Sequence, residues 1–299
     1  MPELPEVEAL RLGLEKKIVN QKILNIKVLK PKIVYSNGTT RQIDKKKVNE
    51  FINGITNKKI KSIKRLAKNL IIYLNDDSVL VIHLKMTGQL VFVDNKKAKT
   101  FGGHPINDTF TKNLPNKHTC IIFELENGTL YYNDIRMFGY VLYYKNILEA
   151  KEKGHFKNIG LEPFDKNFTL AYFKKELRNK KKNIKSVLLD QSIVNGAGNI
   201  YSDEICFASH VLPNRSCTSL TDKEVSLIYN NLKKILSLAI AHGGSSISDY
   251  LLANGSRGNY ARLHKVYGRA GKSCKVCKHI LQKTLVASRT TVYCAYCQQ

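Results

Sequence analysis

The chain opens with Met1-Pro-Glu-Leu-Pro-Glu-Val-Glu8, an acidic stretch that carries two prolines in its first five residues. Proline is favoured in the first turn of a helix, so we expect a helix to begin at Pro5. This helix should run to about residue 20, because apolar residues recur there at helical spacing, at Val7, Leu10, Leu14 and Ile18. The opening stretch therefore predicts an amphipathic helix at the start of the first domain.

Short runs rich in β-branched residues follow this helix. Turn-forming pairs, Asp76-Asp77 and Asn127-Gly128, lie between such runs as they do in β-hairpins. One helix followed by many short strands predicts a β-sandwich or a barrel. We expect residues 94–117 to form a long loop without regular structure, which is either functional or mobile. The expected strands cover residues 23–29, 59–66, 70–74, 79–84, 89–93, 119–125, 129–132 and 140–144.

The pattern changes from about Glu149. Residues 151–164 are typical of a linker, and Thr221 with Glu224 forms a capping-box pattern before a long helix that Gly243-Gly244 would end. We expect a domain over residues 1–148, a linker over 149–165, a helical domain over 166–265 and a small module over 266–299. The helical faces are marked by Leu170, Phe173 and Leu177, and then by Val225, Ile228, Leu232, Ile235 and Ala239.

Four cysteines in the C-terminal module form two CxxC pairs, Cys274-Lys-Val-Cys277 and Cys294-Ala-Tyr-Cys297, separated by sixteen residues. This spacing is typical of a tetrahedral four-thiolate zinc site. Four protein ligands leave no position for substrate, so we expect one structural zinc ion, with disulfides or unliganded thiols as the alternative. The segments 284–286 and 290–293 can form a β-hairpin between the pairs, with Arg289 beside its turn.

The composition favours a polyanionic partner. Among 299 residues, 49 are Lys or Arg and 24 are Asp or Glu, which gives a formal charge of +25. Nucleic acid is the leading partner, ahead of the ribosome or an anionic membrane, and a lysine-rich surface without a partner is the alternative. No run approaches the roughly 18 apolar residues of a membrane span, and the start does not resemble a signal peptide. We therefore expect a soluble intracellular protein.

These motifs, taken in order, closely resemble those of bacterial formamidopyrimidine-DNA glycosylases. The resemblance covers essentially the whole chain, and so many ordered motifs are not expected by chance. The segments that carry it are Pro2-Glu3, Arg65-Leu-Ala-Lys-Asn-Leu70, His83-Leu-Lys-Met-Thr-Gly88, Lys117-His118, Asp134-Ile-Arg-Met-Phe-Gly139, Gly160-Leu-Glu-Pro163, Leu188-Leu-Asp-Gln191, Gly196-Ala-Gly-Asn-Ile-Tyr-Ser-Asp-Glu204, Val266-Tyr-Gly-Arg269 and the cysteine hairpin ending at Cys297-Gln298.

The resemblance implies a catalytic set of Pro2, Glu3, Lys68 and Arg289. Once Met1 is removed, Pro2 presents a secondary α-amine, which titrates near a pKa of about 8 rather than about 10.4 for lysine and can attack C1′ of the damaged nucleotide. Glu3 would act as general acid/base, Lys68 would assist β-elimination, and Arg289 would grip the phosphate near the lesion during δ-elimination. Glu6 either helps to orient the substrate or is only a charge near a helix N-terminus.

The resemblance also implies a DNA-binding set. Met86, Arg136 and Phe138 match three residues that fill the space left by the extruded nucleotide, with Arg136 facing the unpaired cytosine. His118, Lys180 and Asn199 match further DNA contacts, and Asn199 begins the helix–two-turns–helix element. The alternative for residues 180–185 is a solvated charge run. We expect the loop around residues 254–260 to cover the extruded base.

The implied protein is an α+β multidomain enzyme. It has an N-terminal β-sandwich with a leading helix, and a C-terminal helical domain with a helix–two-turns–helix element and a four-cysteine zinc-finger hairpin. It would act as a monomer on double-stranded DNA containing oxidised bases or abasic sites, in the bacterial cytoplasm at the nucleoid. It would excise oxidised purines and cleave the strand by β,δ-elimination, with the DNA in a basic cleft between the domains.

The sequence departs from the family pattern at a few positions. Met137 replaces a second arginine, which removes one phosphate contact, Ile135 replaces a proline, and Cys120 replaces a second histidine. The alternatives are an enzyme of the same superfamily that prefers oxidised pyrimidines, a zinc-dependent DNA-binding protein without catalysis, and a ribosome-associated basic protein. Leu4, together with Met86, Arg136 and Phe138, favours the purine branch.

Overall fold

The computed structural model describes residues 1–35, 44–96, 99–103, 113–178, 180–245 and 259–299. They form two compact units, Met1–Lys157 with His242–Asn259 and Asn158–Ala241 with Tyr260–Gln299. Residues 254–258 of the loop expected over the extruded base lie outside the described residues. The domain bounds given above remain predictions, and each compact unit is considered by itself below.

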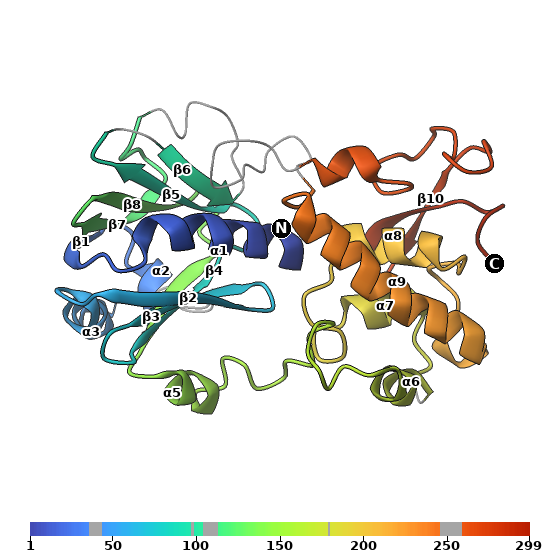
Figure 1. Cartoon of the computed structure of the whole chain (residues 1–299), viewed down its shortest axis with the longest axis horizontal. Coiled ribbons are helices and arrows are strands. Elements are labelled where there is room, and N and C mark those ends of the chain that lie inside the picture. Colours follow the sequence, from blue (N-terminus) through green and yellow to red (C-terminus); the bar gives the residue numbers. More distant parts are fainter. Residues whose placement is uncertain (36–43, 97–98, 104–112, 179, 246–258) are drawn as a thin grey trace. The chain divides into compact units, whose positions relative to one another are not determined.

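The first unit begins with helix α1 (Leu4–Ile18), coloured blue in Figure 1. Pro5 lies in its first turn, and the predicted stripe of Val7, Leu10, Leu14 and Ile18 is buried. These residues join the core of the unit, so the helical spacing in the sequence correctly predicted the buried face.

Two antiparallel sheets make up most of the first unit. The five-stranded sheet has the order β1-β7-β8-β5-β6, and the four-stranded sheet has the order β2-β3-β4-β9. Apolar side chains from both sheets pack into one core, as a β-sandwich requires. The strands are β1 (Ile23–Val28), β2 (Ile60–Leu66), β3 (Asn69–Leu74), β4 (Val79–His83), β5 (Gly88–Asp94), β6 (Lys99–Gly103), β7 (Thr119–Leu125), β8 (Gly128–Asp134) and β9 (Tyr140–Tyr144).

Strand β6 corrects the prediction of an unstructured loop over residues 94–117. It pairs with β5 from Gln89 opposite Gly103 to Val93 opposite Lys99. Gly102 and Gly103 weaken the strand signal in the sequence. Gly102 is required by packing, because a Cβ at this position would collide with the side chain of Leu10 in α1.

Helix α1 packs against one edge strand of each sheet, β6 of the five-stranded sheet and β2 of the four-stranded sheet. Polar contacts fix it to β2: Arg65 Nε donates to Glu8 Oε2 at 2.9 Å, and Arg11 Nη1 donates to the carbonyl of Ile63 at 3.4 Å. The N-terminus of the chain is therefore held by the sandwich itself.

Three short helices complete the first unit: α2 (Lys32–Tyr35), α3 (Lys45–Ile55) and α5 (Ile147–Glu152). Asp44 caps α3 by accepting from the amide of Lys47 at 3.1 Å, and Phe51 and Ile55 bury its apolar face. The spacing of Val48, Phe51, Ile52 and Ile55 in the sequence is the signal that predicts this helix.

The second unit is helical around its own core. The expected capping box is present, since Glu224 Oε2 accepts from the amide of Thr221 at 2.7 Å and Thr221 Oγ1 accepts from the amide of Glu224 at 3.3 Å. The helices are α6 (Leu170–Arg178), α7 (Ile184–Leu189), α8 (Asn199–Ala208) and α9 (Asp222–Ala241), with 3₁₀ turns at Cys217–Ser219 and Tyr260–Leu263. None of the helices in the described ranges has the length and apolar character needed to cross a bilayer.

A two-stranded hairpin ends the second unit. Strands β10 (Gln282–Val286) and β11 (Arg289–Tyr293) pair antiparallel, from Gln282 opposite Tyr293 to Val286 opposite Arg289. Ala287 and Ser288 form the turn, both with positive φ, of 52° and 56°. The hairpin predicted between the two cysteine pairs is therefore present, and Arg289 lies directly after its turn.

Candidate functional site

The start of helix α1 places three predicted groups together. Pro2 and Glu3 are buried, while Met1 is exposed. The amide of Glu3, the N-cap residue, donates to Glu6 Oε2 at 2.9 Å. This contact closes the first helical turn and fixes the direction in which the chain leaves the helix toward Pro2.

Glu6 also holds a segment that is distant in the sequence. Its Oε1 accepts from the amide of Ser245 at 2.7 Å. Gly244 precedes that amide at a φ of +84°, and a Cβ there would lie 2.7 Å from Glu6 Oε1. The Glu6 carboxylate therefore joins the first turn of α1 to the Gly244-Ser245 turn, which exceeds the role of a charge near a helix N-terminus.

Lys68 lies in the turn between β2 and β3, after Ala67, which has a φ of 57°. Its side chain is buried, and burial lowers the pKa of its ammonium group. The carboxylates of Glu3 and Glu6 oppose this shift, and Lys85 adds to it. A lysine with a lowered pKa exchanges a proton more readily near neutral pH than an exposed lysine does.

The α-amine at the N-terminus belongs to the same cluster. Burial lowers the pKa of the Met1 amine; Glu3 and Glu6 raise it and Lys68 lowers it. These interactions place the amino terminus, two carboxylates and Lys68 in one electrostatic neighbourhood. The structure thus brings Lys68, which is distant in the sequence, into the neighbourhood of Pro2 and Glu3.

His83 is a candidate that the sequence reasoning did not single out. Strand pairing sets it opposite Asn69 on one side and Tyr140 on the other, next to Lys68. Burial lowers its pKa to about 3, and Lys85 and Lys68 add to the shift. Its Nδ1 accepts from the amide of Lys85 at 2.9 Å. A single histidine in an apolar strand gives no local signal of this neighbourhood.

The three predicted space-filling residues lie on two turns, at residues 84–88 and 134–139. We call these two turns the reading turns. Asp134 links them: its Oδ1 accepts from Thr87 Oγ1 at 2.5 Å and from the amide of Arg136 at 3.2 Å, and its Oδ2 accepts from the amide of Gly139 at 2.7 Å. Met86 and Phe138 are exposed, although both are large and apolar, and the Arg136 guanidinium lies 4.5 Å from the centroid of the Phe138 ring.

His118 lies at the base of the same turns, because its carbonyl accepts from the amide of Asp134 at 3.0 Å. Burial lowers the pKa of its imidazole, and Lys117 and Lys30 add to the shift. Cys120 is buried behind it, and burial raises its thiol pKa to about 12. An inert, protonated thiol at this position explains how the fold tolerates its departure from histidine.

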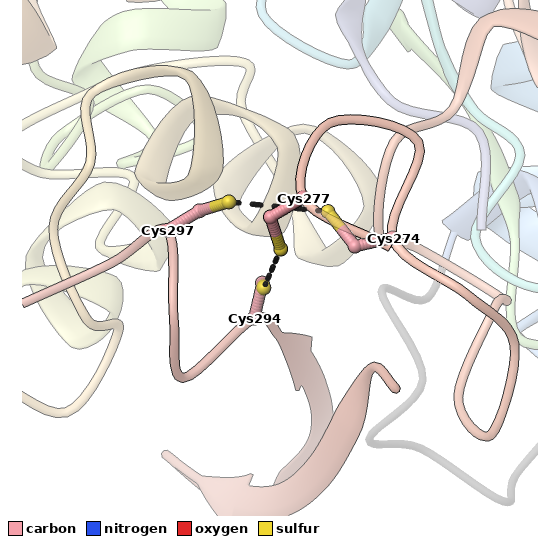
Figure 2. Close-up of side chains that lie close together, drawn as sticks. All are labelled: Cys274, Cys277, Cys294 and Cys297. Carbon is pink, nitrogen blue, oxygen red and sulfur yellow. Dashed lines mark hydrogen bonds between the residues drawn. The ribbon is translucent and has the colours of Figure 1, made fainter. Parts of the chain in front are cut away.

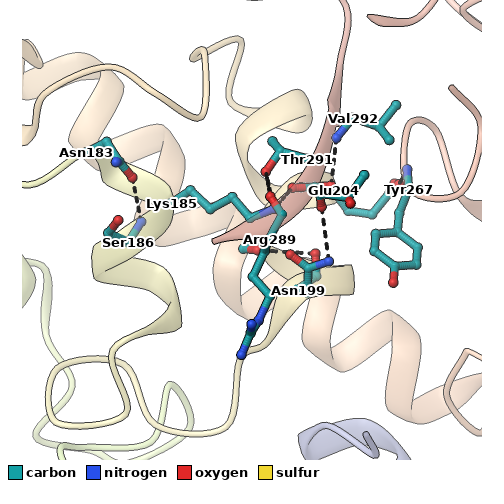
Figure 3. A network of polar contacts seen from close by, with 12 residues as sticks. Asn183, Lys185, Ser186, Asn199, Glu204, Tyr267, Arg289, Thr291 and Val292 are labelled. Atoms are coloured by element: carbon teal, nitrogen blue, oxygen red, sulfur yellow. Dashed lines mark hydrogen bonds and ion pairs between the residues drawn. The ribbon is translucent and has the colours of Figure 1, made fainter. Parts of the chain in front are cut away.

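In the second unit, helix α8 is fixed to the terminal hairpin, as Figure 3 shows. Asn199, the first residue of α8, donates through Nδ2 to the carbonyl of Thr290 at 3.2 Å. Lys185 is fully buried and donates to Asp203 Oδ1 at 2.6 Å and to Thr291 Oγ1 at 2.7 Å. Burial raises the pKa of Asp203 to about 6, and Lys185 opposes the shift.

Asp203 and its neighbour Glu204 extend this connection. Asp203 Oδ2 accepts from the amide of Val292 at 3.0 Å. The carboxylate of Glu204 accepts from three consecutive amides, those of Lys265, Val266 and Tyr267, at 2.8–3.0 Å. Helix α8 therefore holds strand β11 of the hairpin, which begins with Arg289, and also the segment that precedes the hairpin.

The lysine run at residues 180–185 is not uniform. The alternative of a solvated charge run is wrong for Lys185, which is fully buried. Lys182 pairs with Asp190 at 3.6 Å, and Lys180 is half-buried after α6, where its amide donates to the carbonyl of Leu177. Lys181 and Lys182 are exposed and Lys180 is half-buried, so contact of this end of the run with DNA stays a prediction.

The four cysteines of the two pairs converge, as Figure 2 shows. Their sulfur atoms all lie within 4.8 Å of one another, with Cys274 and Cys297 at 4.0 Å and Cys277 and Cys294 at 3.4 Å. Zinc–sulfur bonds of about 2.3 Å in a tetrahedron separate the sulfurs by roughly 3.8 Å. The cluster therefore fits a metal ion with four thiolate ligands.

The predicted residues other than Lys180 thus fall into three groups. Pro2, Glu3 and Lys68 share one electrostatic neighbourhood. Met86, Arg136, Phe138 and His118 surround Asp134. Asn199, Arg289 and the four cysteines belong to the terminal hairpin and the helix that holds it. The first two groups lie in the first unit, and the third lies in the second unit.

Family models and relatives agree on one assignment. The model of the formamidopyrimidine-DNA glycosylase N-terminal domain matches residues 1–141, and the model of the H2TH domain of the same enzyme matches residues 159–250. This chain belongs to the formamidopyrimidine-DNA glycosylase family. It is 37% identical to the Carboxydothermus hydrogenoformans formamidopyrimidine-DNA glycosylase over 299 residues, which is all of both chains.

Other relatives cover the chain just as fully. The Ligilactobacillus salivarius formamidopyrimidine-DNA glycosylase is 38% identical and covers 100% of this chain and 99% of its own. Among solved structures, a Lactococcus lactis Fpg variant with DNA containing Fapy-dG superposes at a TM-score of 0.85, with 32% identity and 100% coverage of both chains. The Lactococcus lactis Fpg with abasic-site DNA gives 0.85, 32% and 99% of both chains.

Proposed function

We propose that this chain is a base excision repair enzyme that removes oxidised purines from double-stranded DNA and then cleaves the strand at the abasic site. The single observation that carries the proposal is the cluster of the amino terminus with Glu3, Glu6 and Lys68. Family membership over the full chain supports the same reaction. The Lactococcus relatives bind DNA containing Fapy-dG or an abasic site.

Pro2 is the proposed nucleophile, acting after Met1 is removed. Its amine lone pair attacks C1′, the glycosidic bond breaks, and the base leaves with the bonding electrons and a proton. Opening of the sugar ring between C1′ and O4′ gives an iminium ion, which accepts electrons during strand elimination. Burial lowers the pKa of the Met1 amine, one residue before Pro2, and we expect the Pro2 amine to experience the same surroundings once Met1 is removed.

Glu3 is the proposed general acid/base, because its buried carboxylate belongs to the cluster around the amino terminus. It would deliver a proton to O4′ as the ring opens. Lys68 would remove or shuttle the proton lost in β-elimination, since burial lowers its pKa. Arg289 would bind the phosphate that leaves in δ-elimination through its planar, bidentate guanidinium.

The reading turns are the proposed site where the duplex is opened. Met86 and Phe138 would fill the space left by the extruded nucleotide, and Arg136 would donate to the acceptor edge of the unpaired cytosine. His118, Lys180 and the start of α8 at Asn199 would contact phosphates. We propose that the protein acts as a monomer at DNA in the bacterial cytoplasm, within the nucleoid.

The metal that the four-cysteine cluster would hold is proposed to be zinc. Cys274, Cys277, Cys294 and Cys297 would fill all four positions, so the ion supplies no open site and no reaction step. Its contribution would be the folding of the hairpin that carries Arg289. The buried side chain of Gln298 accepts from the amide of Cys294 at 2.8 Å and donates to the carbonyl of Val211 at 2.8 Å, which fixes this cluster to the loop after α8.

The test is borohydride trapping on a duplex with 8-oxoguanine opposite cytosine, followed by mass mapping of the cross-linked peptide. We expect an adduct on Pro2, in protein whose intact mass shows that Met1 is absent. A preparation that retains Met1 is the matched control, and it should give no adduct. An adduct on Lys68, or none on Pro2 despite tight lesion binding, contradicts the assignment.

A second candidate prefers oxidised pyrimidines by the same mechanism. One solved structure supports this candidate: the Lactococcus lactis Fpg bound to DNA containing an oxidised pyrimidine, which matches this chain at a TM-score of 0.84 and 32% identity. Comparing single-turnover excision of 8-oxoguanine and thymine glycol decides between the two. Faster excision of thymine glycol would favour the pyrimidine candidate.

A further inference from the structure

Met137 is the one exposed residue of the second reading turn to which the proposed function gives no task. It is 38% exposed and lies between the exposed residues Arg136 and Phe138. Its φ is +51°, in the left-handed region that side chains with a Cβ rarely adopt. Such a conformation costs about 1–2 kcal/mol and persists only where the surrounding contacts enforce it.

The contacts that enforce this conformation are visible on both sides of Met137. Asp134 holds the amide of Arg136 with one carboxylate oxygen and the amide of Gly139 with the other. Gly139 leaves no space for a Cβ, because one would lie 2.7 Å from the carbonyl oxygen of His83. The turn is therefore tightly fixed, and it presents three consecutive side chains, Arg136, Met137 and Phe138, away from the core.

The first reading turn has the same construction. Lys85, the residue before the exposed Met86, has a φ of +49°, and Gly88 closes the turn by donating to the carbonyl of Leu84 at 2.9 Å. In each turn a non-glycine residue in the left-handed region is next to a large exposed apolar side chain. Thr87 joins the two turns through Asp134. Met137 is therefore part of one rigid surface and not of a loose loop.

We propose that Met137 is a fourth DNA-contacting residue of the reading turns, which packs against a base exposed by extrusion of the damaged nucleotide. This inference rests on the proposed function. A thioether side chain carries no charge for a phosphate, but it is polarisable and makes favourable contacts with aromatic rings. The Arg136 guanidinium already lies over the Phe138 ring, so the exposed part of Met137 adds apolar surface beside that pair.

This assignment predicts both affinity and salt dependence. The contact should strengthen binding to DNA with a missing or extruded base, and it should not affect undamaged duplex. A lysine or arginine at position 137 would instead neutralise a phosphate, which steepens the dependence of log K on log salt by about 0.9. The enzyme with Met137 should therefore keep more of its lesion affinity as the salt concentration rises.

The test measures binding to a duplex with a tetrahydrofuran abasic analogue opposite cytosine, and to the same duplex without the lesion. We expect Met137→Ala to weaken lesion binding by about 2- to 10-fold, the range of sulfur–aromatic contacts, with undamaged binding unchanged. Met137→Leu, which keeps the apolar volume but lacks the sulfur, should weaken lesion binding less than Met137→Ala does. Met137→Lys should increase the salt slope by about 0.9. Leu148→Ala, at an exposed apolar residue of α5, is the control and should change nothing.

A second readout reports base contact directly. With 2-aminopurine beside the unpaired cytosine, the emission change on binding should shrink for Met137→Ala and persist for Leu148→Ala. Equal loss of affinity on both duplexes together with a lowered Tm would show a purely structural role for Met137. Unchanged lesion binding would contradict the proposed base contact. The tetrahydrofuran site undergoes no glycosylase chemistry, so these results are independent of whether borohydride traps Pro2.

Discussion

Two buried lysines, one in each unit, occupy opposite chemical situations. Lys185 is fully buried and fixed by Asp203 at 2.6 Å and Thr291 at 2.7 Å. Lys68 is also buried, but burial outweighs the electrostatic effect of Glu3 and Glu6 and lowers its pKa. The comparison teaches that burial alone does not identify a functional lysine. Lys185 is held by a carboxylate and a hydroxyl group that fix helix α7 to the hairpin, whereas burial lowers the pKa of Lys68 beside the amino terminus.

The largest expected effect is a loss of structure on metal removal that is confined to the second unit. Chelation of the ion in the four-cysteine cluster should unfold the terminal hairpin and abolish strand cleavage, because structural zinc contributes on the order of 10 kcal/mol to small metal-dependent modules. Hydrogen exchange should show lost protection over residues 274–297 and retained protection over residues 60–144. Loss of protection in both ranges would show that the first unit also depends on the metal.

The next effect concerns activity at Lys68. We expect Lys68→Met to slow β-elimination at a preformed abasic site by about 10²- to 10⁴-fold, the usual contribution of general acid–base catalysis. The Tm should change less than it does for Lys185→Met, because burial already disfavours the charged form of Lys68. Single-turnover kinetics and a melting curve check both statements. An unchanged rate would remove Lys68 from the catalytic set.

The matched change in the second unit should lower stability and leave the chemistry unchanged. Lys185→Met leaves Asp203 buried without its partner, which costs about 3–5 kcal/mol. Denaturant unfolding should show this loss, while the fraction that remains folded keeps its trapping rate on Pro2. The double variant Lys185→Met/Asp203→Leu should recover most of the stability. Failure to recover it would mean that Thr291 and Val292 contribute more than the ion pair.

A smaller effect tests the turn held by Glu6. Gly244→Ala must place a Cβ 2.7 Å from Glu6 Oε1 at a φ of +84°, whereas Gly271→Ala has a φ of +78° and no atom within 4 Å. Both variants bear the left-handed cost of about 1–2 kcal/mol. Only Gly244→Ala should also reduce the trapping rate. Equal rates for the two would show that the Gly244-Ser245 turn does not influence the amino terminus.

The smallest effect is a dependence of stability on pH, with one histidine in each unit. Burial lowers the pKa of His83 to about 3 and that of His264 to about 4. A depressed folded-state pKa contributes stability above the unfolded value near 6.5, and this stability is lost progressively as the pH falls below that value. Between pH 7.5 and 6.0 each should cost under about 1 kcal/mol. His83→Phe and His264→Phe should each flatten the profile, and an unchanged slope contradicts the assignment.

Much of the fold and part of the site could be predicted from the sequence. Alternating strands, the stripe of α1 and the CxxC spacing are local signals, and each predicted its element within a few residues. Strand β6 could not be predicted because two consecutive glycines have low strand propensity, and Gly102 is required there by its close contact with Leu10 of α1. The contacts of Asp203 and Glu204 could not be predicted either, since their partners lie about sixty to ninety residues along the chain.

Helix α1 has a consequence for the handling and evolution of this protein. The helix packs against one edge strand of each sheet, and uncovered edge strands recruit strands from other molecules. The proposed nucleophile, Pro2, lies two residues before the start of the same helix. Any change that frays α1 should therefore cause aggregation and inactivation together, so that the molecules left in solution are the active ones. Specific activity per soluble molecule should stay constant in such variants while the soluble yield falls.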